Sequence, residues 1–178
     1  PNSIGTAAAL CAIAIQSNQN DQHGGQSVPA FDYSMAPYVG RSFVKNVRKI
    51  ADARGKDCGT MLRCFESELE SGGSVLRMAE NLWPDDPIVR KAVEWTEKDT
   101  YQAMEGLIHN LNTMHSRAGA QVPFSSLNYG TDTSPEGRMV IKNIMLAEEA
   151  GLGNGETPIF PIHIFKMRAG YSADPGDP

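Results

Sequence analysis

The stretch that decides the fold is PFSSLNYGTDTSPEGRMVIKNIMLAEEAGLGNGETPIFPIHIFKM, residues 123–167. Its first part predicts a strand over residues 122–129, which Pro123 opens and Gly130 closes. A helix is then predicted to begin at Ser134, Pro135 and Glu136. Serine suits the N-cap, proline suits the first helical position, and an acidic side chain complements the positive end of a helix.

That helix is expected to stop at Gly151 and to turn four apolar residues inward, namely Val140, Ile141, Ile144 and Met145. Residues 159–167 follow as a near-continuous apolar run, which is typical of a strand buried on both faces. A strand, a helix and a strand in this order predict a βαβ unit with a parallel sheet. The fold class predicted for the chain is therefore α/β and rich in helix.

The first half of the chain predicts two helices separated by a polar stretch that ends in HGGQS, residues 23–27. The first covers residues 3–20, with Ser3 as its N-cap and many small side chains that suit close packing. The second covers residues 35–53, where apolar residues recur on one side, namely Tyr38, Val39, Phe43, Val44, Val47 and Ile50.

Residues 54–86 predict little order, with one short helix over residues 61–70, and look like a variable insertion on the surface. The longest predicted helix follows over residues 87–117 and is expected to end at Gly119. Its apolar stripe consists of Tyr101, Met104, Leu107, Ile108, Leu111 and Met114. The three-part division is thus 1–53, 54–86 and 87–178, all within one partial domain.

Composition excludes several classes of protein. The 178 residues carry a net charge of -5 and no long basic run, so a general nucleic-acid surface is not expected. The apolar stretch Ile4–Ile15 is shorter than the roughly 20 residues that span a bilayer, so no membrane segment is expected. Three cysteines without a CxxC pair indicate a reducing, cytoplasmic setting. Both ends read as interruptions of running sequence.

The loop at residues 130–134, between a strand and a helix start, is a candidate anion site, since its amide N–H groups and hydroxyls can hold a phosphate. The alternative is ordinary capping of a βα turn. HGGQS similarly predicts either a close ligand approach to the backbone or a tight turn. Four cations on the second helix form either a triphosphate clamp or a solvated face, and they are Arg41, Lys45, Arg48 and Lys49.

The remaining reactive residue types support no catalytic or metal site. Histidines at positions 23, 109 and 115 have no partner at metal-ligand spacing. Cys11, Cys58 and Cys64 have no paired base, so nucleophilic catalysis lacks support. From the residues alone, the chain is a helix-rich α/β unit with a candidate anion-binding loop.

A family resemblance adds more. PNSIGTAAA, SNQNDQHGGQS, APYV, DTYQAMEGLIHNLNTMHSRAGAQVPFSSLNYGTDTSPEGR, GLGNGETPIFPI and DPGDP resemble class III (anaerobic) ribonucleotide reductase in order and spacing. The match is weakest at residues 54–86. It implies an early part of a ten-stranded α/β barrel, about a quarter of a subunit that reduces ribonucleoside triphosphates to deoxyribonucleotides.

In that family a glycyl radical, formed by a partner activase with an iron–sulfur cluster and S-adenosylmethionine, relays to a cysteine thiyl radical. Formate or a thiol system is the reductant, and a structural zinc is held by further cysteines. None of the three cysteines of this chain falls on those positions, so the resemblance implies no catalytic residue, no metal ligand and no cofactor here. The isolated segment is expected to be inactive.

The resemblance carries over two partial roles. The first two helices match the homodimer interface and the site for dNTP or ATP effectors, with Lys45 matching a basic residue there and Arg48 added by extrapolation. HGGQS and PFSSLNYG match strands that border the substrate cavity, through residues His23, Gly24, Gly25, Gln26, Ser125, Ser126 and Asn128.

Two other readings stay open at this point. The chain is alternatively a stand-alone nucleotide-binding or dimerisation module without catalysis. A glycyl-radical enzyme of the pyruvate formate-lyase type would share the barrel, but it would not explain the block from Asn110 to Arg138.

Overall fold

The computed structural model describes residues 1–22, 24–115 and 121–177. Its elements, in chain order, are α1 (Ile4–Asn18), β1 (Gln26–Val28), α2 (Phe31–Ala53), α3 (Gly59–Glu70), α4 (Val75–Leu82), α5 (Pro87–Thr113), β2 (Ser125–Tyr129), α6 (Pro135–Ala150) and β3 (Ile162–Phe165). The prediction of a helix-rich α/β fold is confirmed.

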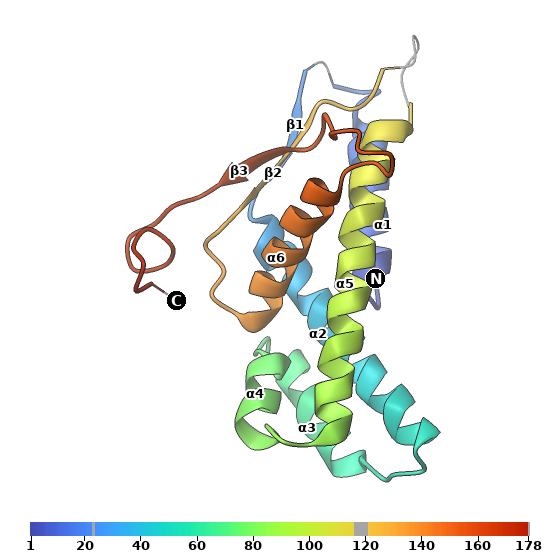
Figure 1. Ribbon diagram of the computed structural model, residues 1–178, viewed down its shortest axis with the longest axis vertical. Coiled ribbons are helices and arrows are strands. Elements are labelled where there is room, and N and C mark those ends of the chain that lie inside the picture. Colours follow the sequence, from blue (N-terminus) through green and yellow to red (C-terminus); the bar gives the residue numbers. More distant parts are fainter. Residues whose placement is uncertain (23, 116–120, 178) are drawn as a thin grey trace.

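The three strands form one parallel sheet in the order β1-β2-β3. Gln26 lies beside Ser125, and Leu127 lies beside His163. Helices α2, α5 and α6 pack against one another next to the sheet, α1 packs along α5, and α3 and α4 lie at the far end of α2 (Figure 1). The predicted βαβ unit is therefore present as β2-α6-β3.

The helix starts follow the predicted capping chemistry. Ser3 accepts a hydrogen bond from the backbone N–H of Thr6, and Ser134 accepts one from that of Gly137. The core lies between the helices and the inner side of the sheet, and its largest fully buried side chains include Phe31, Phe43, Met104, Leu127 and Ile144.

Several predicted boundaries are wrong. Helix α2 begins at Phe31, four residues before the expected start, and α5 ends at Thr113. The expected end of α5 at Gly119 lies outside the described residues. Met145, predicted to face inward, is 54% exposed, because it lies about 100° around the helix from buried Ile144.

The segment 54–86 contains two helices where only one was expected. Ser74 caps the start of α4 with its hydroxyl, and the segment packs against α2. Phe65 is fully buried, with its ring edge-to-face at 5.2 Å from the rings of both Phe43 and Trp83. This segment therefore contributes to the hydrophobic core.

Strand β3 is not buried on both faces as predicted. Ile162 is 57% exposed, Ile164 42% and Phe165 47%. The reason is topological, since β3 is the edge of a three-stranded sheet whose helices cover one face only. In this chain, the apolar run therefore forms an open edge.

Candidate functional site

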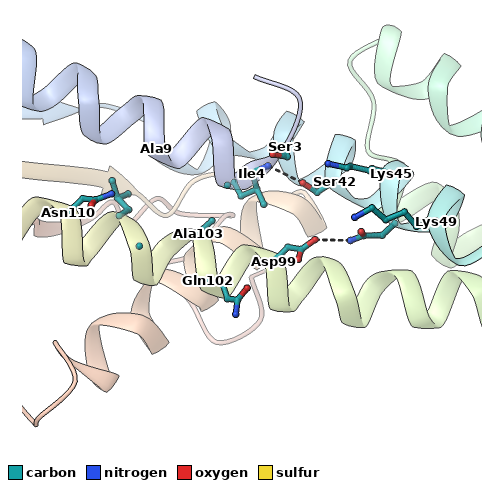
Figure 2. A pocket seen from close by; sticks show the side chains of 14 residues that line it. Ser3, Ile4, Ala9, Ser42, Lys45, Lys49, Asp99, Gln102, Ala103 and Asn110 are labelled. Carbon is teal, nitrogen blue, oxygen red and sulfur yellow. Dashed lines mark hydrogen bonds between the residues drawn. The ribbon is translucent and has the colours of Figure 1, made fainter.

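A polar groove runs between α1, α2 and α5. It has a volume of about 400 Å³, and Lys45 and Lys49 reach it from α2 while Asp99 and Gln102 come from α5 (Figure 2). Gly5 and Gly106 line the groove, and a Cβ added at either would meet no atom within 4 Å, so free space lies beside both.

Hydrogen bonds between helices hold the groove together. The backbone N–H of Ile4 donates to the hydroxyl of Ser42 at 3.0 Å and joins α1 to α2. The amide Nδ2 of Asn46 donates to Asp99 at 3.0 Å and to Thr96 at 3.1 Å, joining α2 to α5. These contacts hold in place the part of α2 that carries the two exposed lysines.

The groove carries a positive excess, because two lysines face one carboxylate. Within the described ranges neither Lys45 nor Lys49 forms an ion pair, whereas an oxygen of Asp99 is already engaged by Asn46. The first turn of α1, at Ser3, Ile4 and Gly5, also lines the groove and adds the positive end of a helix. This combination suits an anion.

The other cations of α2 lie elsewhere. Arg48, predicted to share a phosphate site with Lys45, forms an ion pair with Glu66 of α3 and does not line the groove. Arg41 donates to the backbone oxygen of Pro1 at 2.8 Å and lies over the ring of Tyr38. The structure therefore brings Lys45 together with Lys49 rather than with Arg48.

A second cavity, of about 540 Å³, lies where the three strands begin. It is lined by Gly24, Gly25, Gln26, Ser27, Phe124, Ser125, Ser126, Phe160 and Ile162. Five of the seven residues predicted to border a substrate cavity are therefore brought together here. Asn128 lies further along β2 and donates to the hydroxyl of Ser27 at 2.6 Å. The predicted residue His23 lies outside the described part of the chain.

The predicted residues of β2 point to both sides of the sheet. Ser125 is 3% exposed and shares the helix-covered side with Leu127 and Tyr129. Ser126 and Asn128 point to the opposite side, which the helices leave open, since alternate residues of a strand face opposite ways. On that side the register places Ile162 next to Ser126.

Two of the residues that line this cavity each have one buried atom without a hydrogen-bond partner in the described structure, namely Oγ of Ser125 and Nε2 of Gln26. They come from register partners on adjacent strands. The other amide atom of Gln26, Oε1, accepts a hydrogen bond from Asn18 at 3.0 Å. Both atoms are buried on the helix-covered side of the sheet, since register partners of a parallel sheet face the same way, so they are not open to a ligand in the cavity.

The candidate anion loop at residues 130–134 is already filled by the protein itself. The backbone N–H groups of Gly130, Thr131 and Asp132 donate to one carboxylate oxygen of Asp32, at 2.8, 3.1 and 3.1 Å. Asp32 is fully buried at the start of α2. The loop therefore binds an internal carboxylate in place of an external anion, and Ser134 caps α6 as the alternative expected.

Two of the three thiols have a raised pKa. Burial raises the pKa of Cys11 to about 11. Burial, followed by the charges of Asp86 and Asp57, also raises the pKa of Cys58. In the ranges that the structure describes, no three His, Cys, Asp or Glu residues are grouped to hold a metal ion. None of the described helices is both long and apolar enough to cross a bilayer.

Sequence reasoning missed a partly buried row of three polar side chains, Tyr129, His163 and Glu148, on the helix-covered side of the sheet. The hydroxyl of Tyr129 lies 2.9 Å from Nδ1 of His163, and Nε2 of that ring lies 3.3 Å from a carboxylate oxygen of Glu148. Burial, and secondly the charge of Glu148, raises the pKa of Tyr129. The polar residue His163 inside an apolar run was the available signal.

These features define a helix-covered, parallel α/β unit with a cationic groove on one side and a separate cavity at the sheet. A sequence profile described as anaerobic ribonucleoside-triphosphate reductase matches residues 1–177. The chain belongs to this family.

Three relatives align with the whole chain. It is 31% identical to the anaerobic ribonucleoside-triphosphate reductase of Salmonella typhimurium, 30% identical to that of Escherichia coli and 29% identical to that of Enterobacteria phage T4. The chain spans 21% of the length of the two bacterial proteins and 24% of the phage protein.

Proposed function

We propose that this chain forms the effector-binding region and part of the substrate-cavity wall of an anaerobic ribonucleoside-triphosphate reductase. The whole enzyme would reduce ribonucleoside triphosphates to deoxyribonucleotides in the cytoplasm by glycyl and thiyl radical chemistry. The observation that carries the proposal is the groove that unites Lys45 and Lys49 with the start of α1.

The groove suits the triphosphate of a dNTP or ATP effector. Two ammonium groups without ion pairs in the described structure can each make a charge-assisted contact, worth about 1.5–3 kcal/mol. Arg48 would have to leave Glu66 to take part, so we assign it a secondary role.

Helix α1 supports a homodimer at the same place. Leu10 is 47% exposed and Ile13 is 56% exposed, on a helix whose buried side is also apolar. A helix that is apolar all round is normally covered by a partner. A second copy of the subunit, packing α1 and α2 against their equivalents, would cover it and close the groove from outside.

The open face of the sheet supports the substrate assignment. In a closed ten-stranded barrel, the side that carries Ser126 and Asn128 would turn inward, and the exposed edge of β3 would pair with a further strand. The family resemblance also assigns His23, Gly24, Gly25, Gln26 and Ser125 to the border of this cavity, although the side chain of Ser125 faces the helix-covered side of the sheet.

The chain's own residues perform no radical step in this proposal. Its three cysteines are free thiols, and burial raises the pKa of Cys11 and Cys58. In the part of the chain that the structure describes, no three His, Cys, Asp or Glu residues are grouped to hold a metal ion. The glycyl radical, the structural zinc and the docking of the activase, with its iron–sulfur cluster and S-adenosylmethionine, are assigned to other parts of the enzyme. The isolated segment is expected to show no reductase activity.

A stand-alone nucleotide-binding or dimerisation module is not favoured, because the family match runs from residue 1 to residue 177.

Titration calorimetry of the full-length subunit with dNTPs tests the proposal. Lys45→Ala and Lys49→Ala are each expected to weaken binding about 10- to 150-fold, the equivalent of one lost charge-assisted contact. Lys91→Ala is the matched control, because Lys91 pairs with Glu94 outside the groove. Unchanged dNTP affinity in both groove variants would show that these lysines do not contact the effector, and it would refute the effector site.

A further inference from the structure

The side chain of Asn112, in the last turn of α5, holds the chain that leads into β3. Its Oδ1 accepts hydrogen bonds from the backbone N–H of Ile159 at 2.8 Å and of Phe160 at 3.1 Å. Its Nδ2 donates to the carbonyl oxygen of Phe160 and to that of Ile108 at 2.7 Å. Three of these four contacts join α5 to a segment almost fifty residues away in sequence.

The segment that Asn112 holds forms a wall of the cavity at the sheet. Phe160 is 5% exposed and lines that cavity, where its ring packs edge-to-face against Phe124 at 5.1 Å. Ser126 and its register partner Ile162, which face the open side of the sheet, line the same cavity. A shift of Phe160 would therefore change the space beside Ser126.

The helix that carries Asn112 also forms a wall of the lysine groove. Asp99, Gln102 and Asn110 of α5 line that groove. From Asp99 to Asn112 the helix rises about 20 Å at 1.5 Å per residue, without interruption. One continuous helix thus joins the groove to the cavity wall.

We propose that Asn112 is a positioning residue, which sets the place of Phe160 in the cavity wall and passes the state of the groove to it along α5. The inference rests on the proposed function, since it takes the groove as the effector site and the cavity as part of the substrate site. A ligand that moves α5 relative to α2 would move Phe160 only as long as the three contacts of Asn112 are made.

The experiment uses the full-length reductase with its activase and reductant. Asn112→Leu keeps a similar shape and removes all the hydrogen bonds, whereas Asn112→Asp keeps the two acceptor contacts and removes the donors. Thr113→Val is the matched control, because the Thr113 hydroxyl donates only within the helix, to the carbonyl of His109 at 2.6 Å. Substrate KM and kcat are measured with and without dNTP, and dNTP affinity is measured by calorimetry.

We expect dNTP affinity to stay within about twofold in all three variants, because none of these side chains lines the groove. Effector coupling is typically 5- to 150-fold. In Asn112→Leu the ratio of the substrate KM without dNTP to that with dNTP should fall close to one. The KM itself should rise, and kcat should change less. Asn112→Asp should lose part of the coupling, and Thr113→Val should keep it.

The proposal is overturned if dNTP changes the substrate KM of Asn112→Leu as much as that of the parent enzyme. It is also overturned if Thr113→Val loses this effect of dNTP to the same extent as Asn112→Leu. If Asn112→Leu does not fold, Asn112→Asp becomes the test. The proposal is then overturned if dNTP changes the substrate KM of Asn112→Asp as much as that of the parent enzyme. Failure of both to fold would restrict Asn112 to folding and also overturn it. A parent enzyme that neither binds dNTP nor reduces nucleotides would instead refute the proposed function, so the two failures are distinct.

Discussion

Replacement of Asp32 should cost a large share of the folding free energy. One of its carboxylate oxygens accepts three backbone hydrogen bonds from residues 130–132, of which those from Gly130 and Asp132 are buried. A buried donor left without a partner costs about 1–3 kcal/mol, so Asp32→Ala should destabilise the protein by about 2–6 kcal/mol. Domains of this size are stable by only about 5–15 kcal/mol.

Urea denaturation followed by circular dichroism measures this change. Asp32→Asn, which keeps one acceptor oxygen, should fall between the parent and Asp32→Ala. Asp85→Ala is the control, because Asp85 pairs with Arg90 at the surface and its side chain is 86% exposed. If Asp32→Ala is no less stable than this control, the filled loop is not a structural requirement, and the reasoning is refuted.

Three further predictions concern other buried groups. Since the pKa of Tyr129 in the folded protein lies above its ordinary 10.0, the stability that this shift contributes is complete below pH 10 and is lost as the pH rises towards the folded pKa. In alkaline denaturation, the stability of Tyr129→Phe should therefore fall less steeply with pH than that of the parent. Parallel curves of stability against pH would contradict this prediction. Glu136→Gln should lower the free energy of unfolding by about 1–3 kcal/mol and speed amide hydrogen exchange in α4. The reason is that Glu136 accepts hydrogen bonds from the hydroxyl of Ser74 at 2.6 Å and from the backbone N–H of Leu76 at 2.9 Å. Unchanged exchange rates in α4 would count against this prediction. Burial raises the pKa of Cys11 to about 11 from the usual 9.0, so less of the thiol is present as the reactive thiolate. Alkylation of Cys11, followed by mass spectrometry, should therefore be about 100-fold slower than in the urea-unfolded chain. Equal rates would exclude a protected thiol.

Local signals in the sequence predicted those parts of the fold that depend on neighbouring residues. The start of α6 needed only Ser134 and Pro135, and the parallel sheet followed from the order of a strand, a helix and a strand. Helix α4 was missed because it has only eight residues and lies between a glycine pair and Trp83-Pro84, so its signal is weak.

The parts that sequence reasoning missed depend on distant residues. Nothing near the loop at residues 130–134 indicates that Asp32 fills it, and nothing near Arg48 indicates its pairing with Glu66. The glycine and serine residues at the sheet were predicted to lie together through the family resemblance rather than through spacing. Asn112 gave no local signal, since an asparagine near the end of a helix usually has a local role.

The link between Asp32 and Gly130 has a consequence for synthesis of the chain, since the two residues are 98 apart in sequence. At about 5–20 residues per second on the ribosome, the start of α2 waits roughly 5–20 s for the loop that covers its carboxylate. Over the same interval the edge of β1 that pairs with β2 stays unpaired. During this period of synthesis, the carboxylate of Asp32, which is buried in the folded protein, and the edge of β1 are both exposed to water. Chaperone binding would be most useful at that stage.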